Sequence, residues 1–460
     1  MKEFPSPFER FRSAYRRWRA PYLDLLDQAA DAERRGDEVA RGVLVKRAFA
    51  ARDAQLERKP LSPRTWRYLA QFAARTFDLE GLESALGKVV GRRKHALKCQ
   101  FGRLRSSSSL FARAHASLRR AADGLEEPYA PITLYVPLNA IRKGPTGAQL
   151  RFTLRAIDAA LEASGAPYAI DVRFSAQGRK QAEPGRRYIS YHTFSAEDGG
   201  LHFKEADQLG FISFDERGFS GWSQFGETPL NELGLERSPQ HIVTNYVSEF
   251  RKRVVSGNVS KMEQSETGDG LAPGYVFVAL QVMDDAVMRL ADMPMLVMLR
   301  EVSEACRARG VRVVVKRHPR CRSEIVTRAL KKGVEQGEFV EAHGSIHTLI
   351  DGAIAVCVVN SAVGAEALLH HKPVYAFGAS EYQQACFRVR RRGQFAALFE
   401  PHQLPVSTDV MDKFLYLLRT SYSVDVCDEE QAEAWIKQRV LGFLGAPERN
   451  AFSRAAPVRA

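Results

Sequence analysis

Hydrophobic residues recur at three- and four-residue spacing through most of the first 125 positions, with basic and polar residues between them. This period is typical of amphipathic helices, and it predicts helices over residues 10–30, 38–57 and 64–77. The first helix would carry a basic face and aromatic residues, namely Arg12, Arg16, Arg17, Arg19, Phe11, Tyr15, Trp18 and Tyr22. The simplest interpretation is a solvated basic face with the aromatic residues in a core. Contact with anionic lipid headgroups is the alternative.

The pattern changes after Pro131. Residues 132–136, 168–173 and 188–191 are expected to form strands and residues 147–163 a helix, which indicates an α/β layer. Residues 201–223, LHFKEADQLGFISFDERGFSGWS, show no clear period, and we expect a loop of the kind that carries function on a rigid scaffold. A helix follows over residues 240–255. The polar, Gly-rich stretch 256–274 is predicted to be a linker.

From Tyr275 onward, short apolar segments alternate with helical ones. The predicted strands are 275–282, 311–319, 338–342, 353–361 and 372–378, with helices at 294–308, 323–335, 345–351 and 363–370. Strands without a polar face are typical of a parallel sheet covered on both sides. Helices near 411–421 and 429–444 close the chain. The predicted class is therefore α/β, with two Rossmann-like lobes and a helical N-terminal extension.

These patterns divide the chain into five parts. Residues 1–125 form the basic helical region, 126–270 the first α/β lobe and 271–400 the Rossmann-like lobe. Residues 401–447 form the closing helices, and 448–460 are expected to be a disordered tail.

The charge of the chain is unevenly distributed. Its 460 residues carry a formal net charge of +13, and residues 1–130 hold 27 Lys and Arg against 16 Asp and Glu. We find no apolar run of the roughly 18–20 residues that a transmembrane helix needs, and no apolar leader. We expect a cytoplasmic protein whose basic helices suit a peripheral contact with the anionic inner membrane. Nucleic acid is not an expected partner.

Cysteine and histidine give no sign of a metal or disulfide framework. The six cysteines contain no C-x-x-C pair, so we expect reduced thiols. Four histidines, His343, His347, His370 and His371, lie near one another in sequence, but adjacent positions on a helix end point apart. No metal site and no cofactor are predicted.

Polar side chains gather where the predicted strands end, and in a parallel sheet these ends share one edge. The set combines carboxylates, cations, amides, small hydroxyls and a glycine: Gln281, Asp284, Asp285, Lys316, His318, Ser345, His347, Asn360, Ser361, Gly364 and Glu366. No single residue of this set indicates a particular function. The indication of a site is that all of them are expected at one edge of the sheet.

The chemistry of this set suits a phosphate-bearing donor. Ser361 to Gly364 would place small residues and free N–H groups at a helix start, and Gly364 would let a ligand approach the backbone. Lys316 and His318 could neutralise a leaving phosphate, and Glu366 could hold ribose hydroxyls. The chain has neither a Walker A loop nor a G-x-G-x-x-G fingerprint, which favours a nucleotide-sugar over ATP or NAD.

Structural explanations compete for the same residues. Ser345 and Ser361 could simply cap helices, and His318 could be satisfied locally where Pro319 ends a strand. Asp284 and Asp285 could be solvated loop carboxylates.

Four segments resemble the capsule polysaccharide biosynthesis family, which includes retaining β-Kdo transferases that use CMP-β-Kdo. They are QVMDDA (281–286), KRHP (316–319), SIHTLI (345–350) and VVNSAVGAEALLHHKPVYAFG (358–378). FDERGFSGWS (214–223), with Lys204 and Glu205 upstream, resembles the acceptor-side loop of that family. The likeness covers about residues 185–385. It implies a GT-B-like fold with the nucleotide in the C-terminal lobe and the acceptor on the other.

The resemblance also implies residue roles. Asp285 would be the nucleophile that forms a covalent glycosyl-enzyme, although Asp284 stays open in the frame Met283-Asp284-Asp285. His318 would bind or protonate the CMP phosphate, and Glu205, or else Glu216, would act as base on the acceptor. The remaining donor-side set is Gln281, Lys316, Ser345, Ile346, His347, Asn360, Ser361, Val363, Gly364 and Glu366. The remaining acceptor-side set is Glu216, Ser220, Gly221 and Trp222.

The leading hypothesis is thus transfer of Kdo from CMP-β-Kdo to a surface-polysaccharide or lipid-linked glycan acceptor. The nearest alternative is another nucleotide-activated transferase on the same fold, for sialic acid or glycerol phosphate. A non-catalytic scaffold of a capsule assembly complex is the third.

The basic N-terminal region generates the first prediction. We expect the protein to bind liposomes that contain anionic phospholipid, and to lose this binding as salt rises, because exposed charges are screened. Co-sedimentation of the full chain and of a chain lacking residues 1–125 measures it. Liposome binding that does not change with salt concentration, or that persists without residues 1–125, would contradict membrane docking through this region.

Overall fold

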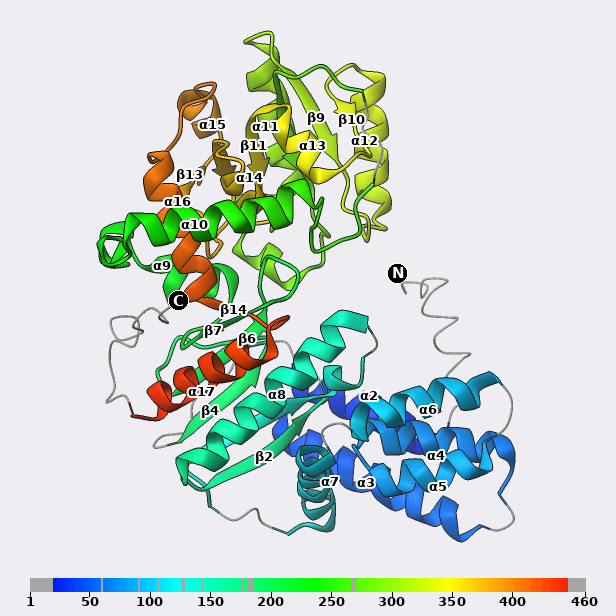
Figure 1. Cartoon of the computed structure of the whole chain (residues 1–460). Helices are drawn as coiled ribbons and strands as arrows, with labels where there is room; N and C mark the ends of the chain where they lie inside the picture. The colour runs from blue at the N-terminus through cyan, green and yellow to red at the C-terminus, as the bar shows by residue number, and fades with distance from the viewer. Residues whose placement is uncertain are drawn as a thin grey trace. The chain divides into compact units, whose positions relative to one another are not determined.

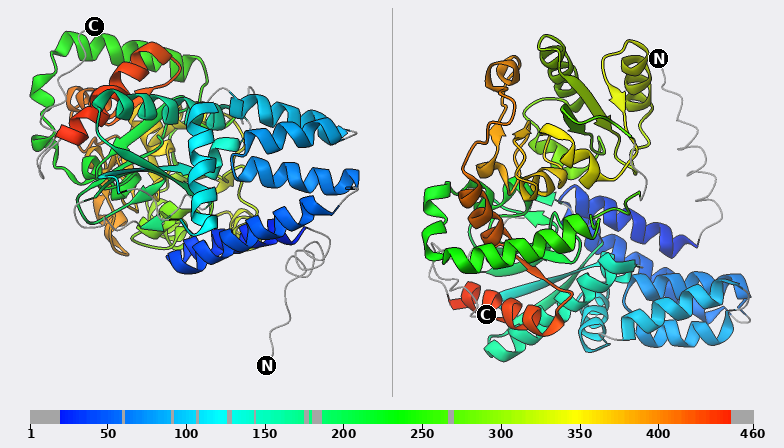
Figure 2. Two further views of the ribbon diagram at one scale, coloured as in Figure 1. Left: turned by 90° about the horizontal axis from the view of Figure 1, so that it is seen from below. Right: turned by 45° about the horizontal axis from the view of Figure 1, so that its top comes forward.

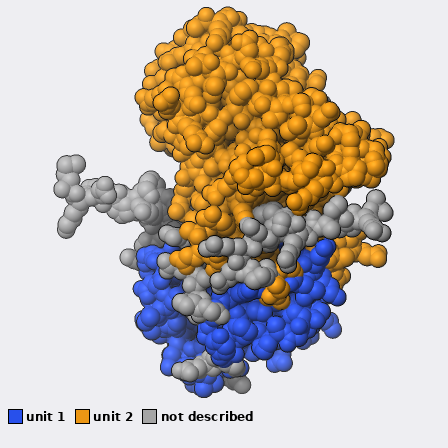
Figure 3. All heavy atoms as spheres, turned by 90° about the vertical axis from the view of Figure 1, so that its left-hand side faces the viewer, with its two compact units in different colours: residues 1–193, 436–441 blue, residues 194–435, 442–460 orange. Residues whose placement is uncertain are grey.

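The computed structural model describes residues 20–58, 61–89, 92–105, 108–125, 129–142, 144–174, 178–179, 186–265 and 270–445. The chain forms two compact units, shown in blue and orange in Figure 3. Unit 1 runs to Thr193 and takes in Ile436–Leu441, and unit 2 holds Phe194–Trp435 and the rest. Residues 10–19 of the predicted basic-aromatic helix, with all of its named basic and aromatic residues except Tyr22, lie outside the described residues. The predicted tail 448–460 also lies outside them. The five-part division of the chain stays a prediction.

Unit 1 begins with the predicted helices, which Figure 2 shows as a bundle. They are α2 (Pro21–Arg34), α3 (Glu38–Glu57), α4 (Pro63–Arg75), α5 (Leu79–Lys88), α6 (Arg92–Arg105) and α7 (Ser108–Asp123). Side-chain caps begin three of them, from Asp37, Ser62 and Asp78. Inside the bundle Phe72 packs edge-on against Tyr22 and Phe49, with ring centroids 5.5 and 5.2 Å apart.

A group of parallel strands follows in the same unit. Strand β1 (Ile132–Pro137) pairs in parallel with β2 (Tyr168–Arg173) and with β4 (Arg187–Tyr191). Helix α8 (Gly144–Ser164) connects β1 to β2 and covers this group (Figure 1). The half-buried Arg41 of α3 donates to Asp171 of β2 over 2.9 Å, which ties the bundle to the strands. Two further short strands are β3 (Gly178–Arg179) and β5 (Thr193–Phe194).

Unit 2 opens with strands where the sequence led us to expect a loop. Strands β6 (Gly200–Glu205) and β7 (Phe211–Asp215) are antiparallel, and β7 also pairs antiparallel with β14 (Ser423–Asp425). The expectation was wrong because β7 is buried on both faces and β6 along most of its length, so polar and apolar positions do not alternate.

The loop after β7 is organised by one carboxylate. Asp215 Oδ1 accepts backbone N–H groups of Arg217, Gly218 and Gln224 over 2.8–3.1 Å, and Oδ2 accepts that of Phe225 over 3.1 Å. Burial, together with the nearby Glu216 carboxylate, raises the pKa of Asp215 to about 6. The loop holds η2 (Ser220–Trp222), α9 (Gln224–Glu227), η3 (Leu230–Glu232) and η4 (Leu235–Arg237).

The second sheet is the predicted parallel one. Its order is β10-β9-β8-β11-β12-β13, and every pairing is parallel. The strands are β8 (Tyr275–Ala279), β9 (Arg312–Lys316), β10 (Val340–Glu341), β11 (Ala353–Val358), β12 (Val374–Ala376) and β13 (Phe387–Arg388). This is the 3-2-1-4-5-6 order of a doubly wound sheet, so the chain reverses direction between β8 and β11. The predicted α/β class, with a Rossmann-like parallel sheet in the C-terminal part of the chain, is confirmed.

Helices connect and close this sheet. They are α11 (Met295–Arg307), α12 (Glu324–Glu335), α13 (Ile346–Asp351), α14 (Val363–Leu369), α15 (Gln394–Leu398) and α16 (Thr408–Thr420), with η6 (Ala286–Leu290) and η7 (Gln383–Ala385). The last helix, α17 (Glu429–Gly445), does not cover this sheet, and its residues 436–441 belong to unit 1. Helix α10 (Gln240–Arg251) continues as η5 (Lys252–Ser256) and packs against α16.

The predicted linker is not a free connection. Residues 258–264, which we call the strap, hydrogen-bond to the start of α13. Gln264 Oε1 accepts the Ile346 N–H over 2.9 Å, and Ser345 donates to Asn258 Oδ1.

Asp215 generates a stability prediction. Asp215→Ala leaves four N–H groups, two buried and two part-buried, without their acceptor, so we expect a loss of about 3–5 kcal/mol in the free energy of unfolding. Chemical denaturation measures it. The exposed Asp198→Ala is the matched control and should change stability by about 0.5 kcal/mol or less. Equal losses of unfolding free energy in the two variants would show that Asp215 does not organise the loop.

Candidate active site

The edge of the second sheet at its direction reversal is where open α/β sheets bind ligands. Here Gln281, two residues after β8, and Asn360, two residues after β11, face each other. Gln281 Nε2 donates to Asn360 Oδ1 over 2.9 Å, and Gln281 Oε1 accepts the Asn360 N–H over 3.0 Å. Asn360 Nδ2 then donates to the carbonyls of Val287 and Ala379 over 2.7 and 3.2 Å. Both residues were predicted to bind the donor. In the structure their side-chain amides hydrogen-bond to each other and to the surrounding loops, and so hold those loops in place.

Asp285 and Asp284 lie next to this pair. Both carboxylates are exposed. Asp285 is the N-cap residue of η6, but its side chain makes no capping hydrogen bond. Within the described residues, no hydrogen bond or ion pair occupies the Asp285 carboxylate. It is therefore available to a reacting group. The structure gives Asp284 the same exposure, so it leaves the choice between them open.

His318 lies on the neighbouring strand end. Its Nδ1 accepts the N–H of Arg320 over 3.1 Å, so a neutral ring carries its proton on Nε2. Burial and the Arg320 charge lower the pKa of His318, and the Asp285 carboxylate opposes them. The lowered pKa favours a neutral imidazole that can donate a hydrogen bond from Nε2. The Asp285 carboxylate influences this pKa.

Four predicted donor-side residues around α13 have partners within the protein. Lys316 donates to the Gly344 carbonyl. Ser345 and Ile346 bind the strap, and Ser345 Oγ also accepts the His347 N–H over 3.2 Å, which confirms it as an N-cap. His347 Nε2 lies 2.9 Å from the Val259 carbonyl of the strap and its Nδ1 lies 3.0 Å from His370 Nε2. The strap therefore covers the groups that the sequence assigned to a donor.

Ser361, Val363 and Gly364 lie where β11 meets α14. Ser361 Oγ accepts the Val363 N–H over 3.4 Å, and the Tyr382 hydroxyl donates to the Ser361 carbonyl. A Cβ on Gly364 would lie 2.5 Å from the Tyr382 ring. Gly364 thus makes room for Tyr382, whereas the sequence suggested room for a ligand.

Glu366 is 3% exposed. Burial raises its pKa to about 7, against the Ser260 hydroxyl and the charges of Arg419 and Lys261, which lower it. Lys261 is itself perturbed, since desolvation and the nearby Lys204 ammonium lower its pKa to about 8. Although Lys261 as a residue is exposed, its ammonium donates to the Ala206 and Glu205 carbonyls over 2.5 and 3.4 Å.

The acceptor-side residues lie on β6 and the loop after β7. Glu205 is the last residue of β6 and is half-buried, as is Glu216 beyond β7. Ser220 has φ = +53°, a conformation that non-glycine residues rarely adopt, and its hydroxyl hydrogen-bonds to Glu381. A Cβ on Gly221 would lie 2.4 Å from the Ala379 Cβ, so the loop contacts the segment after β12 directly. The structure therefore joins acceptor-side and donor-side segments at Ser220 and Gly221.

Sequence reasoning missed a buried charge cluster at this junction. Arg419 of α16 makes two hydrogen bonds to Asp207, 2.6 and 2.5 Å long, and both residues are 4% exposed. Burial and the Asp207 carboxylate raise the pKa of Glu381, whereas Ser220 and Lys204 lower it. These residues come from positions 207, 381 and 419, and no local motif signals their meeting.

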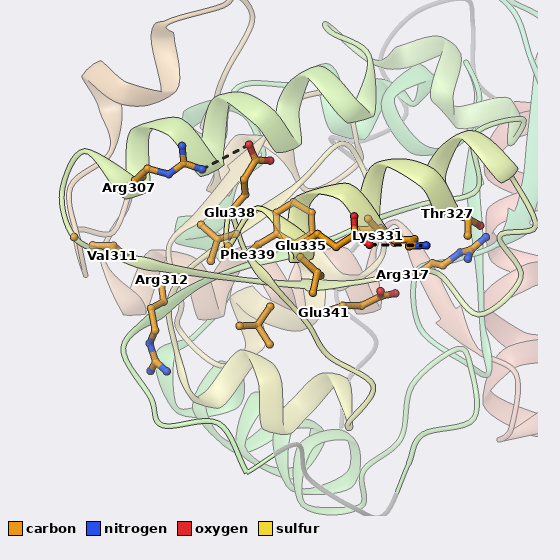
Figure 4. A pocket seen from close by; sticks show the side chains of 16 residues that line it. Arg307, Val311, Arg312, Arg317, Thr327, Lys331, Glu335, Glu338, Phe339 and Glu341 are labelled. Carbon is orange, nitrogen blue, oxygen red and sulfur yellow. Dashed lines mark ion pairs between the residues drawn. The ribbon is translucent and has the colours of Figure 1, made fainter.

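A hollow of about 960 Å³ lies elsewhere in unit 2, along the edge strand β10 between α11 and α12. Figure 4 shows its lining, in which Arg307 pairs with Glu338 and Lys331 with Glu335. None of the predicted site residues lines it. The lining also includes Arg312 and Arg317, for which no ion pair with a described carboxylate is found.

Metal binding, membrane spanning and disulfide bonding are three further properties of the described residues. Within the described residues, no group of three or more His, Cys, Asp or Glu side chains is placed to hold a metal ion. No described helix is long and apolar enough to cross a bilayer. The six cysteines, all among the described residues, are free.

Comparison with known proteins identifies the class. Residues 238–388 match the family described as "Capsule polysaccharide biosynthesis protein". This segment contains the strand-end residues, and its match to the family model confirms the resemblance seen in the sequence. Glu205 and the 214–223 loop precede the match. No curated protein matches the chain.

Solved structures show weaker similarity. The β-Kdo 2,7-transferase KpsC of Thermosulfurimonas dismutans is 14% identical, with a TM-score of 0.39 over 67% of this chain and 99% of that one. The β-Kdo 2,4-transferase of the same organism is 12% identical, with a TM-score of 0.40 over 68% and 99%. A glycosyltransferase from Rickettsia africae is 8% identical, with a TM-score of 0.30 over 69% and 99%. At these TM-scores the similarity assigns no residue and no activity.

The pKa of Glu366 generates a prediction for stability against pH. In the unfolded chain a glutamate titrates near 4.3, so between about pH 4.5 and 7 only the folded state keeps this proton. The contribution of Glu366 to stability therefore falls as pH rises through that window, by on the order of 3 kcal/mol. Glu366→Gln should become steadily more stable relative to wild type as pH rises from 4.5 to 7.5.

Urea unfolding at several pH values checks this. The exposed Glu304→Gln of α11 is the matched control, and its difference from wild type should not change with pH. A constant difference for Glu366→Gln would contradict the raised pKa.

Proposed function

We propose that the protein is a retaining glycosyltransferase that moves Kdo from CMP-β-Kdo to a surface-polysaccharide or lipid-linked glycan acceptor. The family match of residues 238–388 supports it. The observation that carries the proposal is the pair of Asp285 and His318 at one sheet edge. The Asp285 carboxylate is exposed and has no partner among the described residues. The His318 imidazole is half-buried and, when neutral, carries its proton on Nε2.

In the first step the Asp285 carboxylate attacks the anomeric carbon of Kdo. The bond from that carbon to the phosphate oxygen breaks, and its electron pair stays on the departing CMP. His318 Nε2–H donates a hydrogen bond to the phosphate. Full proton transfer is unnecessary because a phosphate is already a good leaving group, and this agrees with a lowered histidine pKa.

In the second step an acceptor hydroxyl attacks the same carbon and displaces Asp285. Two inversions give net retention. Glu205, at the end of β6, takes the hydroxyl proton, and Glu216 is the second candidate. The segment that carries Glu205 is anchored through the carbonyls that Lys261 binds.

Donor binding in this proposal requires the strap to move. Ser345, Ile346 and His347 are bonded to residues 258–264, and Glu366 is buried beside Ser260 and Lys261. A ribose can reach Glu366 only when these strap residues are displaced. The proposed reaction includes no metal ion.

The covalent intermediate provides the test. Incubation with CMP-β-Kdo and no acceptor should add one Kdo mass to the wild-type protein and none to Asp285→Ala, because the attacking carboxylate is then gone. Intact-protein mass spectrometry measures this adduct. Asp284→Ala is the matched control and should still form it. An adduct lost only in Asp284→Ala would move the nucleophile by one residue.

Absence of both adduct and CMP release would reject this donor. CMP-sialic acid and CDP-glycerol are then the next donors, and failure of all three would favour a scaffold.

A further inference from the structure

Five exposed arginines lie at the edge of the parallel sheet that holds the candidate nucleophile. Two of them follow strand β9, and three lie in the connection between β13 and α15. Because every pairing in this sheet is parallel, the segments that follow its strands leave at the same edge. We call this set the arginine rim, and its members are Arg320, Arg322, Arg390, Arg391 and Arg392.

The two parts of the arginine rim flank the point where the sheet reverses direction. In the sheet order, β9 lies one strand outside β8, and β13 lies two strands outside β11 (Figure 1). At the usual spacing of about 4.8 Å between strands, these distances are about 5 Å from β8 and about 10 Å from β11. The charge of Arg320 reaches the site, because it adds to burial in lowering the pKa of His318.

The fold itself does not neutralise the arginine rim. Within the described residues, none of its five guanidinium groups forms a hydrogen bond or an ion pair. The exposed Glu324, two residues after Arg322, does not pair with it either. Other arginines of unit 2 differ, since Arg388 of β13 pairs with Asp292. The rim therefore carries five positive charges that remain open to a ligand in solution.

The same sheet edge would repel an anionic donor without these charges. The proposed donor carries two negative charges near neutral pH, one on the phosphate diester and one on the Kdo carboxylate. Asp284 and Asp285 are exposed at this edge, and neither forms an ion pair with a described residue. Because like charges repel, these carboxylates oppose the approach of the donor that one of them has to attack.

We propose that the arginine rim is an electrostatic funnel for the donor. It attracts a nucleotide-sugar with at least two negative charges toward the sheet edge and offsets the repulsion from Asp284 and Asp285. The rim acts through its long-range field, so it raises the rate of encounter and the local concentration of donor and leaves the chemical step unchanged. This rests on the proposed transferase function and goes beyond it, since the reaction proposed above gives the rim no role.

The salt dependence of adduct formation tests the funnel without any acceptor. The screening length falls from roughly 20 Å at 20 mM salt to roughly 6 Å at 300 mM, so the field of the rim fades over this range. We expect the second-order rate constant for the wild-type adduct, at low CMP-β-Kdo, to fall about tenfold. The limiting rate at saturating donor should change little. Quenched reactions followed by intact-protein mass spectrometry measure both.

Removing charge from the rim gives the second test. Arg390→Gln, Arg391→Gln and Arg392→Gln together should lower the second-order rate constant about three- to fivefold at 20 mM salt. The difference from wild type should disappear at 300 mM salt, and the limiting rate should be unchanged at both. Adding Arg322→Gln to this rim variant should deepen the loss at low salt. Thermal melts confirm that each variant is folded.

The matched control removes the same three charges elsewhere. Arg300, Arg328 and Lys332 are exposed on α11 and α12, and none forms an ion pair with a described residue. Replacing these three by Gln should leave the rate constant within about 1.5-fold of wild type at every salt concentration.

Three results would overturn the funnel. They are a wild-type rate constant that does not change with salt, equal losses in the rim and control variants, and a loss in the limiting rate that does not depend on salt. The last result would place the arginines in direct contact with the donor.

Nucleotide binding separates the funnel from the proposed reaction. CMP carries nearly two negative charges at pH 7.5 and cytidine none. In NMR titrations at 20 mM salt, the variant at residues 390–392 should bind CMP about threefold more weakly than wild type and cytidine equally well. This result without any wild-type adduct would reject the Kdo reaction and retain the funnel. Equal CMP affinity of the two proteins, or no CMP binding by wild type, would overturn the funnel.

Discussion

The two hydrogen bonds between Gln281 and Asn360 join the ends of β8 and β11 where the sheet reverses direction. The remaining amide protons of Asn360 bind the segment after Asp285 and the segment after β12. A buried amide pair of this kind is stable only when its donors and acceptors are satisfied together. The geometry around the candidate nucleophile therefore depends on this pair, and the loop that carries Ser220 and Trp222 depends on it indirectly.

A second constraint is electrostatic. Asp207, Glu366 and Glu381 are buried near Arg419, with Lys204 and Lys261 at their margin. Burial alone would neutralise such carboxylates, and the cations oppose it, which leaves Glu366 with a pKa of about 7. Protonation there is coupled to the strap through Ser260 and Lys261. The strap that covers the predicted donor residues thus lies against one carboxyl group, that of Glu366, with a pKa of about 7.

Most of the fold could be predicted from the sequence, and the failures share a cause. The parallel strands and their helices were recognisable because apolar runs of strand length alternate with helical periods. The hairpin of β6 and β7 was missed because burial on both faces removes the alternation that marks a strand. The strap was taken for a linker because its polar residues, Asn258 and Gln264, have partners about 80 positions away.

The sequence by itself determined the class of fold, the sheet edge that holds the candidate site, and the residue types there, since local period and strand-end position encode them. Only the tertiary structure decided which of these side chains are available. In the structure Gln281 and Asn360 hydrogen-bond to each other, and Gly364 packs against Tyr382. His347 contacts the strap, whereas Asp285 remains exposed. The tertiary structure also brought Arg289 to the edge of the stacked rings of Phe194 and Trp222. These outcomes depend on contacts between segments far apart in the chain, which no local pattern contains.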